Sequence, residues 1–317
     1  MTHIDFTIIT PVYNGEDYII ETINSVLANL EPDFSYEYLV INDGSSDQTP
    51  ALINEFSDVE IIQVINNENM GEAASVNYGI SKSKGSFVLI VNADDPLLSP
   101  KIFSESMKVF NMYPETVVVY PDWQVISSSG EVIEIRRLPD YSEKKLIGEF
   151  WCLPGPGAIF RKESAQKIGG RDIEYKFVSD YDFWLRLSRL GTFFHLPLVL
   201  AQWRSHEDST SISSRGLTMG LERIRVIEKF LSDFTIEENL KRSALASAYY
   251  NAALLCYFSK DVPGCRWVTK AFLSNRGIIP RADLRIVLYC ALHPFSRLLI
   301  PILNRTPFIN NPIKKKP

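Results

Sequence analysis

The sequence predicts an α/β fold in which helices flank a mostly parallel sheet, followed by an all-helical extension at the C-terminus. Over the first 125 residues or so, short and nearly continuous apolar segments alternate with amphipathic ones, the pattern of buried parallel strands joined by helices. Polar clusters follow the apolar segments, and after about residue 216 the spacing is helical throughout. We therefore expect one domain at residues 1–215 and a helical subdomain at residues 216–317.

The individual elements follow from β-branched apolar runs and from apolar residues repeated every three or four positions. In the first domain this predicts strands at 6–10, 37–41, 60–65 and 87–91, and helices at 16–30, 50–56 and 71–82. Separate strands joined by turns are expected at 117–120, 123–126 and 131–135, then a helix at 179–190 and a strand-rich return at 193–203. The extension should contain helices at 221–231, 240–258, 265–273 and 282–292.

Composition excludes several classes of protein. With 317 residues, 45% hydrophobic and 22% charged, the chain has ample material for a core and is not disordered. Its formal net charge of −5 argues against binding nucleic acid through bulk charge, so no nucleic-acid partner is expected. The four cysteines lack CxxC spacing, which indicates neither a zinc ribbon nor a disulfide framework but a reducing, cytoplasmic location.

No signal peptide and no run of about 20 apolar residues is apparent, so no membrane-spanning helix is expected. The apolar stretch at 284–303 is interrupted by charged residues and Pro294, and three lysines follow at 314–316. A buried core helix with a solvated tail is the favoured interpretation. A peripheral contact with the inner face of the membrane, or a homo-oligomer through the C-terminal helices, is the alternative.

Polar clusters occur where four predicted strands end, at 13–14, 42–44, 66–67 and 92–95. Parallel sheets bind ligands beyond the carboxyl ends of their strands, so these clusters should converge. The adjacent carboxylates Asp94 and Asp95 offer hard oxygen ligands for Mg²⁺ or Mn²⁺, although an Asp-Asp-Pro turn is also common at the surface. Asp43 could accept a hydrogen bond from a base and Tyr13 could stack on one.

Neither G-x-G-x-x-G nor a Walker A sequence occurs, which disfavours nicotinamide dehydrogenases and phosphate-loop nucleotidases. Instead the segments at 7–14, 40–47, 69–71, 92–95, 155–161 and 179–184, in this order, resemble those of family 2 glycosyltransferases with the GT-A fold. The likeness covers residues 5–210. It implies an inverting enzyme that moves a sugar from a nucleotide diphosphate, usually UDP, to a hydroxyl of a saccharide or lipid-linked acceptor in cell-surface polysaccharide synthesis.

The resemblance also implies roles for individual residues. It assigns the donor nucleotide to Pro11, Val12, Tyr13, Asn14, Asp43, Gly71, Asn77, Asn92 and Asp94. It assigns a Mn²⁺ or Mg²⁺ cofactor to Asp95, with Asp94. Relatives often carry an Arg-x-His where Arg204 could pair with phosphate and His206 could bind the metal or the diphosphate, the alternative being a polar surface loop. Gly157 could shape an acceptor site, which is compatible with a turn before the next strand, and Trp151 could stack on an acceptor sugar, although a core tryptophan is commoner. Many relatives have Asp where this chain has Asn92, which could alter metal affinity or donor choice.

Asp180 matches the catalytic base of the family, which must take a proton from the acceptor hydroxyl. Alternatively, Ser179 and Asp182 form a capping box and Asp180 is a structural acid of the first helical turn. Two other functions stay open. A non-catalytic nucleotide-sugar or glycan-binding protein draws support from Asn92, whereas a sugar nucleotidyltransferase would need a basic, glycine-rich loop where residues 15–17 are acidic.

Overall fold

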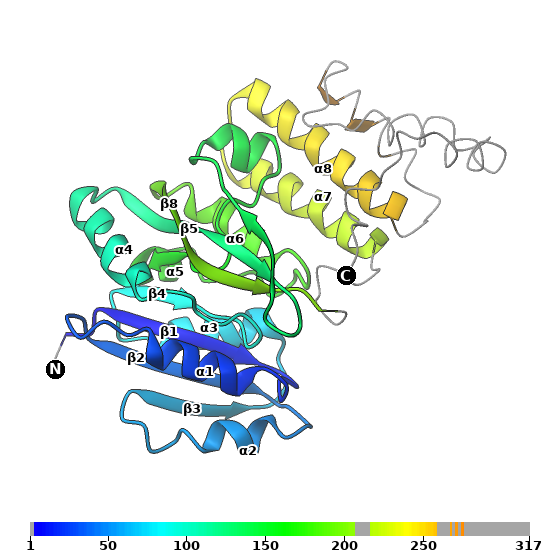
Figure 1. Cartoon of the computed structure of the whole chain (residues 1–317). Helices are drawn as coiled ribbons and strands as arrows, with labels where there is room; N and C mark the ends of the chain where they lie inside the picture. Colours follow the sequence, from blue (N-terminus) through cyan, green and yellow to red (C-terminus); the bar gives the residue numbers. More distant parts are fainter. Residues whose placement is uncertain (1–2, 207–215, 259–266, 268–269, 272–273, 276–317) are drawn as a thin grey trace. The chain divides into compact units, whose positions relative to one another are not determined.

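The computed structural model describes residues 3–206, 216–258, 267, 270–271 and 274–275 (Figure 1). The chain divides into two compact units. The first comprises Met1–Ile147 and Trp151–Ser213, and the second comprises Gly148–Phe150 and Ser214–Pro317. The first unit contains the sheet and every candidate residue named above.

An eight-stranded sheet forms the first unit, in the order β3-β2-β1-β4-β7-β5-β6, with β8 paired to β5. Its strands are β1 (Phe6–Val12), β2 (Tyr36–Asp43), β3 (Ile62–Asn67), β4 (Phe87–Ile90), β5 (Thr116–Ile126), β6 (Val132–Arg136), β7 (Ile159–Arg161) and β8 (Thr192–Arg204). The pairs among β1, β2, β3 and β4 are parallel, as is β5 with β8, whereas the pairs of β7 and β6 are antiparallel. This confirms the predicted mixed, mostly parallel sheet.

Helices cover both faces of the sheet (Figure 1). They are α1 (Ile19–Ala28), α2 (Thr49–Asn54), α3 (Glu72–Lys82), α4 (Lys101–Met112), α5 (Lys162–Lys167) and α6 (Ser179–Leu187), with a π-helical turn η1 at Lys144–Gly148. Residues of β1 alternate between the two faces, so Ile8 joins the core that contains α1 and α4, while Ile9 faces α3. Close packing of α3 requires Gly79, because a Cβ atom there would lie 2.7 Å from Ile9 Cγ2.

Strand β5 differs from the prediction, and two helices were not expected. Residues 116–126 form a single strand, β5, where two strands joined by a turn were expected. Pro121 and Asp122 lie between the two expected strands, and β8, which runs beside β5, accommodates them within one strand through shifts of register at these residues. Helices α4 and α5 were not predicted at all.

The second unit contains α7 (Gly216–Asp233) and α8 (Glu238–Phe258), which include the helices expected at 221–231 and 240–258. Most of the helix expected at 265–273, and all of the segments at 282–292 and 314–316, lie outside the described residues, and so do the predictions of membrane contact and oligomerisation that rest on them. Within the described part of the chain, no helix is both long and apolar enough to span a membrane.

Candidate active site

Loops from four strands meet at one edge of the sheet. Because β3, β2, β1 and β4 are neighbours and parallel, their carboxyl ends lie side by side. Side chains join adjacent loops there: Asn42 Nδ2 donates to Asn66 Oδ1 at 2.9 Å, and the Ser46 N–H donates to Asn14 Oδ1 at 2.8 Å. The polar clusters therefore converge as the parallel topology requires.

Residues 11–14 were expected to contact the donor nucleotide, and Tyr13 and Asn14 are the two of them that are exposed. Pro11 and Val12 are buried within the strand, so their side chains pack in the core. Tyr13 is 54% exposed, and its ring is free to stack on a ligand. Asn14 has a φ of +50°, a conformation that asparagine tolerates and that turns the chain out of the sheet.

Asp43, at the end of β2, is buried, and its two carboxylate oxygens accept hydrogen bonds from the backbone N–H groups of Met70 and Gly71, both at 2.8 Å. These bonds fix the turn that leads into α3. Gly71 has a φ of +88°, which favours glycine, and is exposed. In this structure Asp43 therefore organises the loop at the edge of the sheet, and base contact by its carboxylate stays a prediction.

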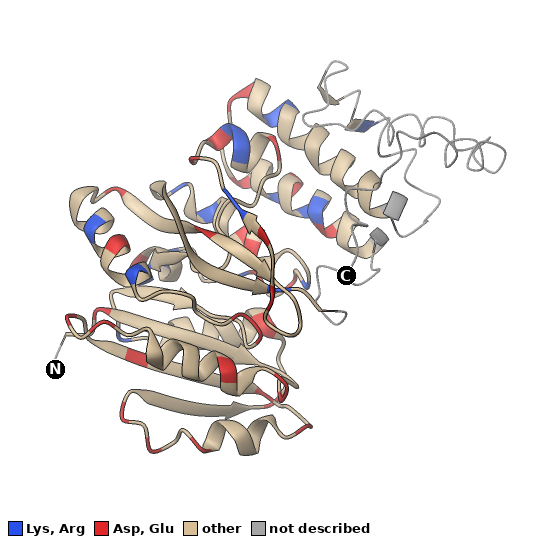
Figure 2. Ribbon diagram, viewed as in Figure 1, with Lys and Arg blue, Asp and Glu red and all other residues tan. Residues whose placement is uncertain are grey.

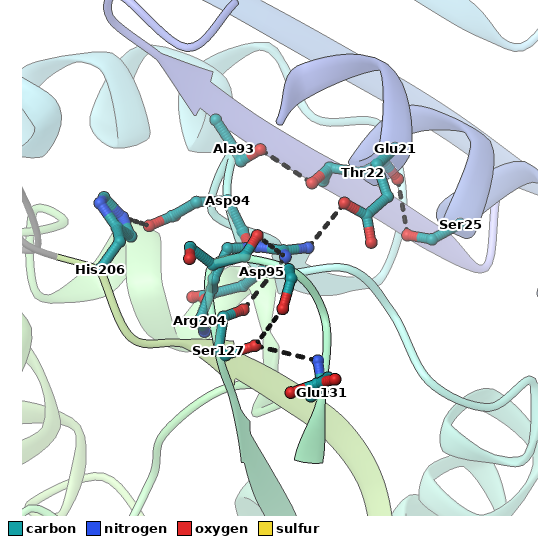
Figure 3. Close-up of polar contacts among 12 residues, drawn as sticks. Glu21, Thr22, Ser25, Ala93, Asp94, Asp95, Ser127, Glu131, Arg204 and His206 are labelled. Carbon is teal, nitrogen blue, oxygen red and sulfur yellow. Dashed lines mark hydrogen bonds and ion pairs between the residues drawn. The ribbon is translucent and has the colours of Figure 1, made fainter. Parts of the chain in front are cut away.

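Asp94 and His206 meet although 112 residues separate them in the sequence (Figure 3). His206 Nε2 lies 2.9 Å from Asp94 Oδ2, and the two side chains are 17% and 30% exposed. The His206 ring also lies 5.4 Å from that of Tyr18, centroid to centroid. A carboxylate and an imidazole thus lie together in reach of solvent, beyond the end of β4.

Asp95, the residue expected to bind the metal, is buried in this structure. It is 5% exposed, and its carboxylate accepts hydrogen bonds from the Arg204 backbone N–H at 2.8 Å and from Asn92 Nδ2 at 2.9 Å. Burial, and then the charge of Asp94, raises the pKa of Asp95 well above its usual range, although these two donors lower it. Both oxygens serve the fold, so Asp95 is a structural acceptor here.

Arg204 is also buried, which argues against the phosphate contact expected of it. Its side chain is 1% exposed, and the guanidinium donates to the Asp94 carbonyl at 2.9 Å, to Glu21 Oε2 at 2.7 Å and to the carbonyls of Ser127 and Ser128 (Figure 3). The ring of Tyr18 lies 4.7 Å away from the guanidinium. Arg204 thereby ties the end of β8 to α1 and to the 92–95 loop.

Asp180 lies in the first turn of α6 and is half-buried. Burial raises the pKa of Asp180 above its ordinary value, the Arg171 guanidinium lowers it by a smaller amount, and Glu72 raises it again. The capping box expected at Ser179 and Asp182 is not formed, because α6 has no side-chain cap and the Asp182 carboxylate binds Arg186. Asp180 does lie in the first turn, so a structural role for it stays the alternative to catalysis. A carboxyl group with a raised pKa is suited to accept a proton.

Both polar atoms of the Asn77 side chain are hydrogen-bonded within the protein. Its amide nitrogen donates to the Arg171 carbonyl at 2.8 Å and its oxygen accepts from the Arg171 N–H at 2.7 Å. Asn77 therefore clamps the backbone of Arg171 rather than facing a nucleotide. Sequence reasoning missed Arg171 and its partner Glu72, which lie 99 residues apart; two glycines before Arg171 were the only local signal.

Of the residues suggested for the acceptor, Gly157 lies near the 92–95 loop. Gly157 has a φ of +79° and packs on β8, where a Cβ atom would lie 2.7 Å from Ala201 Cβ. It lines a small hollow of about 20 Å³, room for one water molecule, together with Asn92, Asp95 and Gln202. Trp151 is half-buried, and its backbone N–H donates to the Lys145 carbonyl. Neither Asp43 nor Asp180 lines this hollow.

The structure also limits how a metal ion could be held. Among the residues that it describes, no group of three or more His, Cys, Asp or Glu side chains is arranged around a common point. Asp94 provides an oxygen ligand that suits Mn²⁺ or Mg²⁺, and His206 provides a nitrogen ligand that suits a transition metal such as Mn²⁺ better than Mg²⁺; the oxygens of a diphosphate and water could complete the coordination. The donor set therefore fits a cation shared with a nucleotide, and a metal contact by Asp95 stays a prediction.

Known structures share this fold. TarS from S. aureus in complex with UDP-GlcNAc superposes with a TM-score of 0.68 at 17% identity, over 93% of this chain and 88% of that one. The mannosyltransferase PcManGT from Pyrobaculum calidifontis, in complex with GDP-Man and Mn²⁺, gives 0.58 at 14% identity, over 96% and 83%. These likenesses confirm the GT-A architecture.

Sequence relatives are more informative about the family. An uncharacterized glycosyltransferase of Rickettsia typhi is 31% identical over 65% of this chain and 65% of its own length, and the hyaluronan synthase of Pasteurella multocida is 26% identical over 77% and 24%. The chain thus spans less than two thirds of these relatives. The model of the family described as glycosyl transferase family 2 matches residues 7–169, half of the chain. The chain therefore belongs to glycosyltransferase family 2.

Proposed function

We propose that this chain is an inverting, metal-dependent glycosyltransferase that moves a sugar from a UDP-sugar to a hydroxyl of a saccharide or lipid-linked acceptor in cell-surface polysaccharide synthesis. The observation that carries the proposal is the pairing of Asp94 with His206, 2.9 Å apart at the carboxyl edge of the sheet. Membership of the family supports sugar transfer. Relatives named hyaluronan synthase and chondroitin synthase support a saccharide acceptor.

The charge of the nucleotide-binding half supports the need for a cation. No Lys or Arg occurs before Lys82, and Figure 2 shows no basic residue on β1, β2 or β3. A diphosphate bound there would meet no basic side chain from these elements. A divalent cation held by Asp94 and His206 would supply the missing positive charge and stabilise the departing diphosphate.

The remaining chemistry belongs to side chains of the protein. Tyr13 would stack on the base, and the turns fixed by Asp43 would line the nucleotide. Asp180 would take the proton from the acceptor hydroxyl as that oxygen attacks the anomeric carbon from the side opposite the diphosphate. Its raised pKa makes it a stronger base than an exposed aspartate.

The rival of a non-catalytic binding protein rested on Asn92, and the hydrogen bond that this residue donates weakens it. An aspartate at position 92 would put a third carboxylate beside the buried Asp95, whereas the amide of Asn92 satisfies one of its oxygens. The hydrogen bond to Asp95 therefore explains the asparagine at position 92 without requiring a decayed site.

The test combines binding and turnover. Thermal shift with a panel of UDP- and GDP-sugars, with and without Mn²⁺, should identify the donor as the compound that raises the melting temperature only with the metal. That donor should release nucleoside diphosphate when saccharide acceptors are added. Asp94→Asn should lose the Mn²⁺-dependent shift, and Asp180→Asn should keep it but lose turnover. Turnover that is independent of metal, or unaffected in Asp180→Asn, would contradict the proposal.

A further inference from the structure

The imidazole ring of His195 lies between two carboxyl groups. His195 belongs to β8, and its Nε2 atom lies 2.9 Å from Asp122 Oδ1 on the neighbouring strand β5. Its Nδ1 atom lies 3.2 Å from Oδ1 of Asp140, in the segment 137–140 that follows β6. The ring of Tyr120 stacks on the imidazole, with 5.2 Å between the ring centroids. The His195 side chain is 7% exposed, so its nitrogens depend on these partners more than on water.

Two such contacts require the ring to carry two protons. A neutral imidazole has one N–H group and one acceptor nitrogen, whereas the imidazolium has two N–H groups. Burial alone would raise the pKa of Asp122, but hydrogen bonds from Leu138, Arg137 and His195 outweigh burial and lower it, so this group is an ionised acceptor. If the ring were neutral, its acceptor nitrogen would point at a carboxylate oxygen and be repelled.

The same cluster holds the segment after β6 against the sheet. Asp122 is 1% exposed, and its carboxylate also accepts hydrogen bonds from the Arg137 guanidinium and from the Leu138 backbone N–H, each at 2.8 Å. The Tyr120 hydroxyl donates to the Pro139 carbonyl at 2.9 Å. The four residues of this segment therefore all bind side chains of β5 or β8.

We propose that His195 is a pH-sensitive switch that anchors the segment 137–140 to the sheet through Asp140 when its ring carries two protons, and releases Asp140 when it loses one. Asp140 is the partner that leaves, because its side chain is 93% exposed, whereas Asp122 is buried and held by two further donors. The anchor contributes fully at low pH and is lost as the pH rises and the ring becomes neutral.

The anchored segment leads to the helix that carries Asp180. The chain continues from residue 140 into η1, where the Leu146 carbonyl accepts a hydrogen bond from the Tyr181 hydroxyl. Tyr181 follows Asp180 in the first turn of α6. His195 and Tyr181 therefore hold the two ends of one connection, and the switch frees only the end at the sheet.

NMR reads the protonation of the ring directly. Long-range ¹H–¹⁵N correlation detects the protons on each ring nitrogen, and the signals of His195 are assigned by replacing the other three of the four histidines. Both nitrogens should carry protons at about pH 5.5 and only one at about pH 8. A single N–H group at the lower pH would overturn the inference.

Hydrogen exchange measures whether the segment follows the ring. The protection of a peptide covering 137–141, normalised to the intrinsic exchange rate at each pH, should fall about fivefold between about pH 5.5 and about pH 8, as expected for one exposed, charged hydrogen bond. Asp140→Asn places an amide opposite the ring, which can pair with either protonation state, so the dependence on pH should disappear. The control Glu143→Gln removes an exposed carboxylate that binds Arg189, and should keep the fivefold fall.

Constant protection in the wild type over this range would overturn the switch, and so would the same fall in Asp140→Asn. The exposure of Asp140 makes its substitution safe for the fold, so the comparison can be made on a folded variant. Neither measurement uses a donor, an acceptor or a metal, so the result is independent of the proposed sugar transfer.

Discussion

Replacing Arg204 with lysine should destabilise the first unit without weakening nucleotide binding. The guanidinium reaches acceptors in three separate segments: Glu21 on α1, the Asp94 carbonyl, and the carbonyls that follow β5. A lysine ammonium is a single point and cannot bind all three. With two or three hydrogen bonds lost at about 1 kcal/mol each, and buried acceptors left unsatisfied, we expect a loss of about 3 kcal/mol.

Urea unfolding followed by tryptophan fluorescence measures this loss, because four of the five tryptophans belong to the first unit. A loss of 3 kcal/mol with a slope of about 2 kcal/mol per molar urea lowers the midpoint by about 1.5 M. Arg189→Lys, at a more exposed ion pair, is the matched control and should change stability by less than about 0.5 kcal/mol. UDP affinity, measured in Mn²⁺ where both variants are folded, should stay within about twofold of the wild type.

The opposite pattern would refute this reasoning. If Arg204→Lys kept the urea midpoint of the wild type but bound UDP tenfold more weakly, Arg204 would be a phosphate ligand, as its sequence context suggested. The buried network around it would then be irrelevant to stability.

Three further predictions concern other hydrogen-bonded side chains of the first unit. Asp43→Asn replaces an acceptor with a donor opposite a backbone N–H, and should cost about 2 kcal/mol in urea unfolding. Asn77→Ala strips two partners from the backbone of Arg171 and should cost a similar amount, with UDP affinity unchanged. Burial alone would raise the pKa of Asp122, but hydrogen bonds, including one from His195, outweigh it and lower that pKa. The stability that Asp122 contributes is present above its unfolded pKa and lost as the pH falls through its folded one, so melting temperatures of Asp122→Asn should fall less steeply with acidification than those of the wild type.

Local pattern was sufficient for the parallel half of the sheet. Each of β1, β2, β3 and β4 is an apolar run followed by a polar turn, and right-handed crossovers leave little choice in their arrangement. The same pattern misread β5, because its continuity depends on β8, which begins after residue 190. A proline within a run argues against a strand only when no distant partner accommodates the irregularity.

The topology also predicted where the candidate site lies, but it could not predict which groups each carboxylate binds. The backbone N–H groups of Met70 and Arg204, which bind Asp43 and Asp95, lie 27 and 109 positions away, and such pairings leave no trace in local sequence. Asp43, Asp95 and Arg204 resemble ligands in sequence because they are charged, and in the structure each of them is buried and hydrogen-bonded within the fold. The amino acid types therefore predicted the region of the candidate site, whereas the contacts of each residue depended on distant parts of the chain.

The exposed pair of Asp94 and His206 depends on the buried contacts between Asp95, Asp94 and Arg204. His206 lies only two residues beyond Arg204, whose N–H binds the Asp95 carboxylate and whose guanidinium binds the Asp94 carbonyl. The backbone bond, which a lysine at position 204 would keep, holds the end of β8 against the 92–95 loop and so brings His206 to the carboxylate of Asp94. The buried contact of the second aspartate thus supports the exposed pair through geometry.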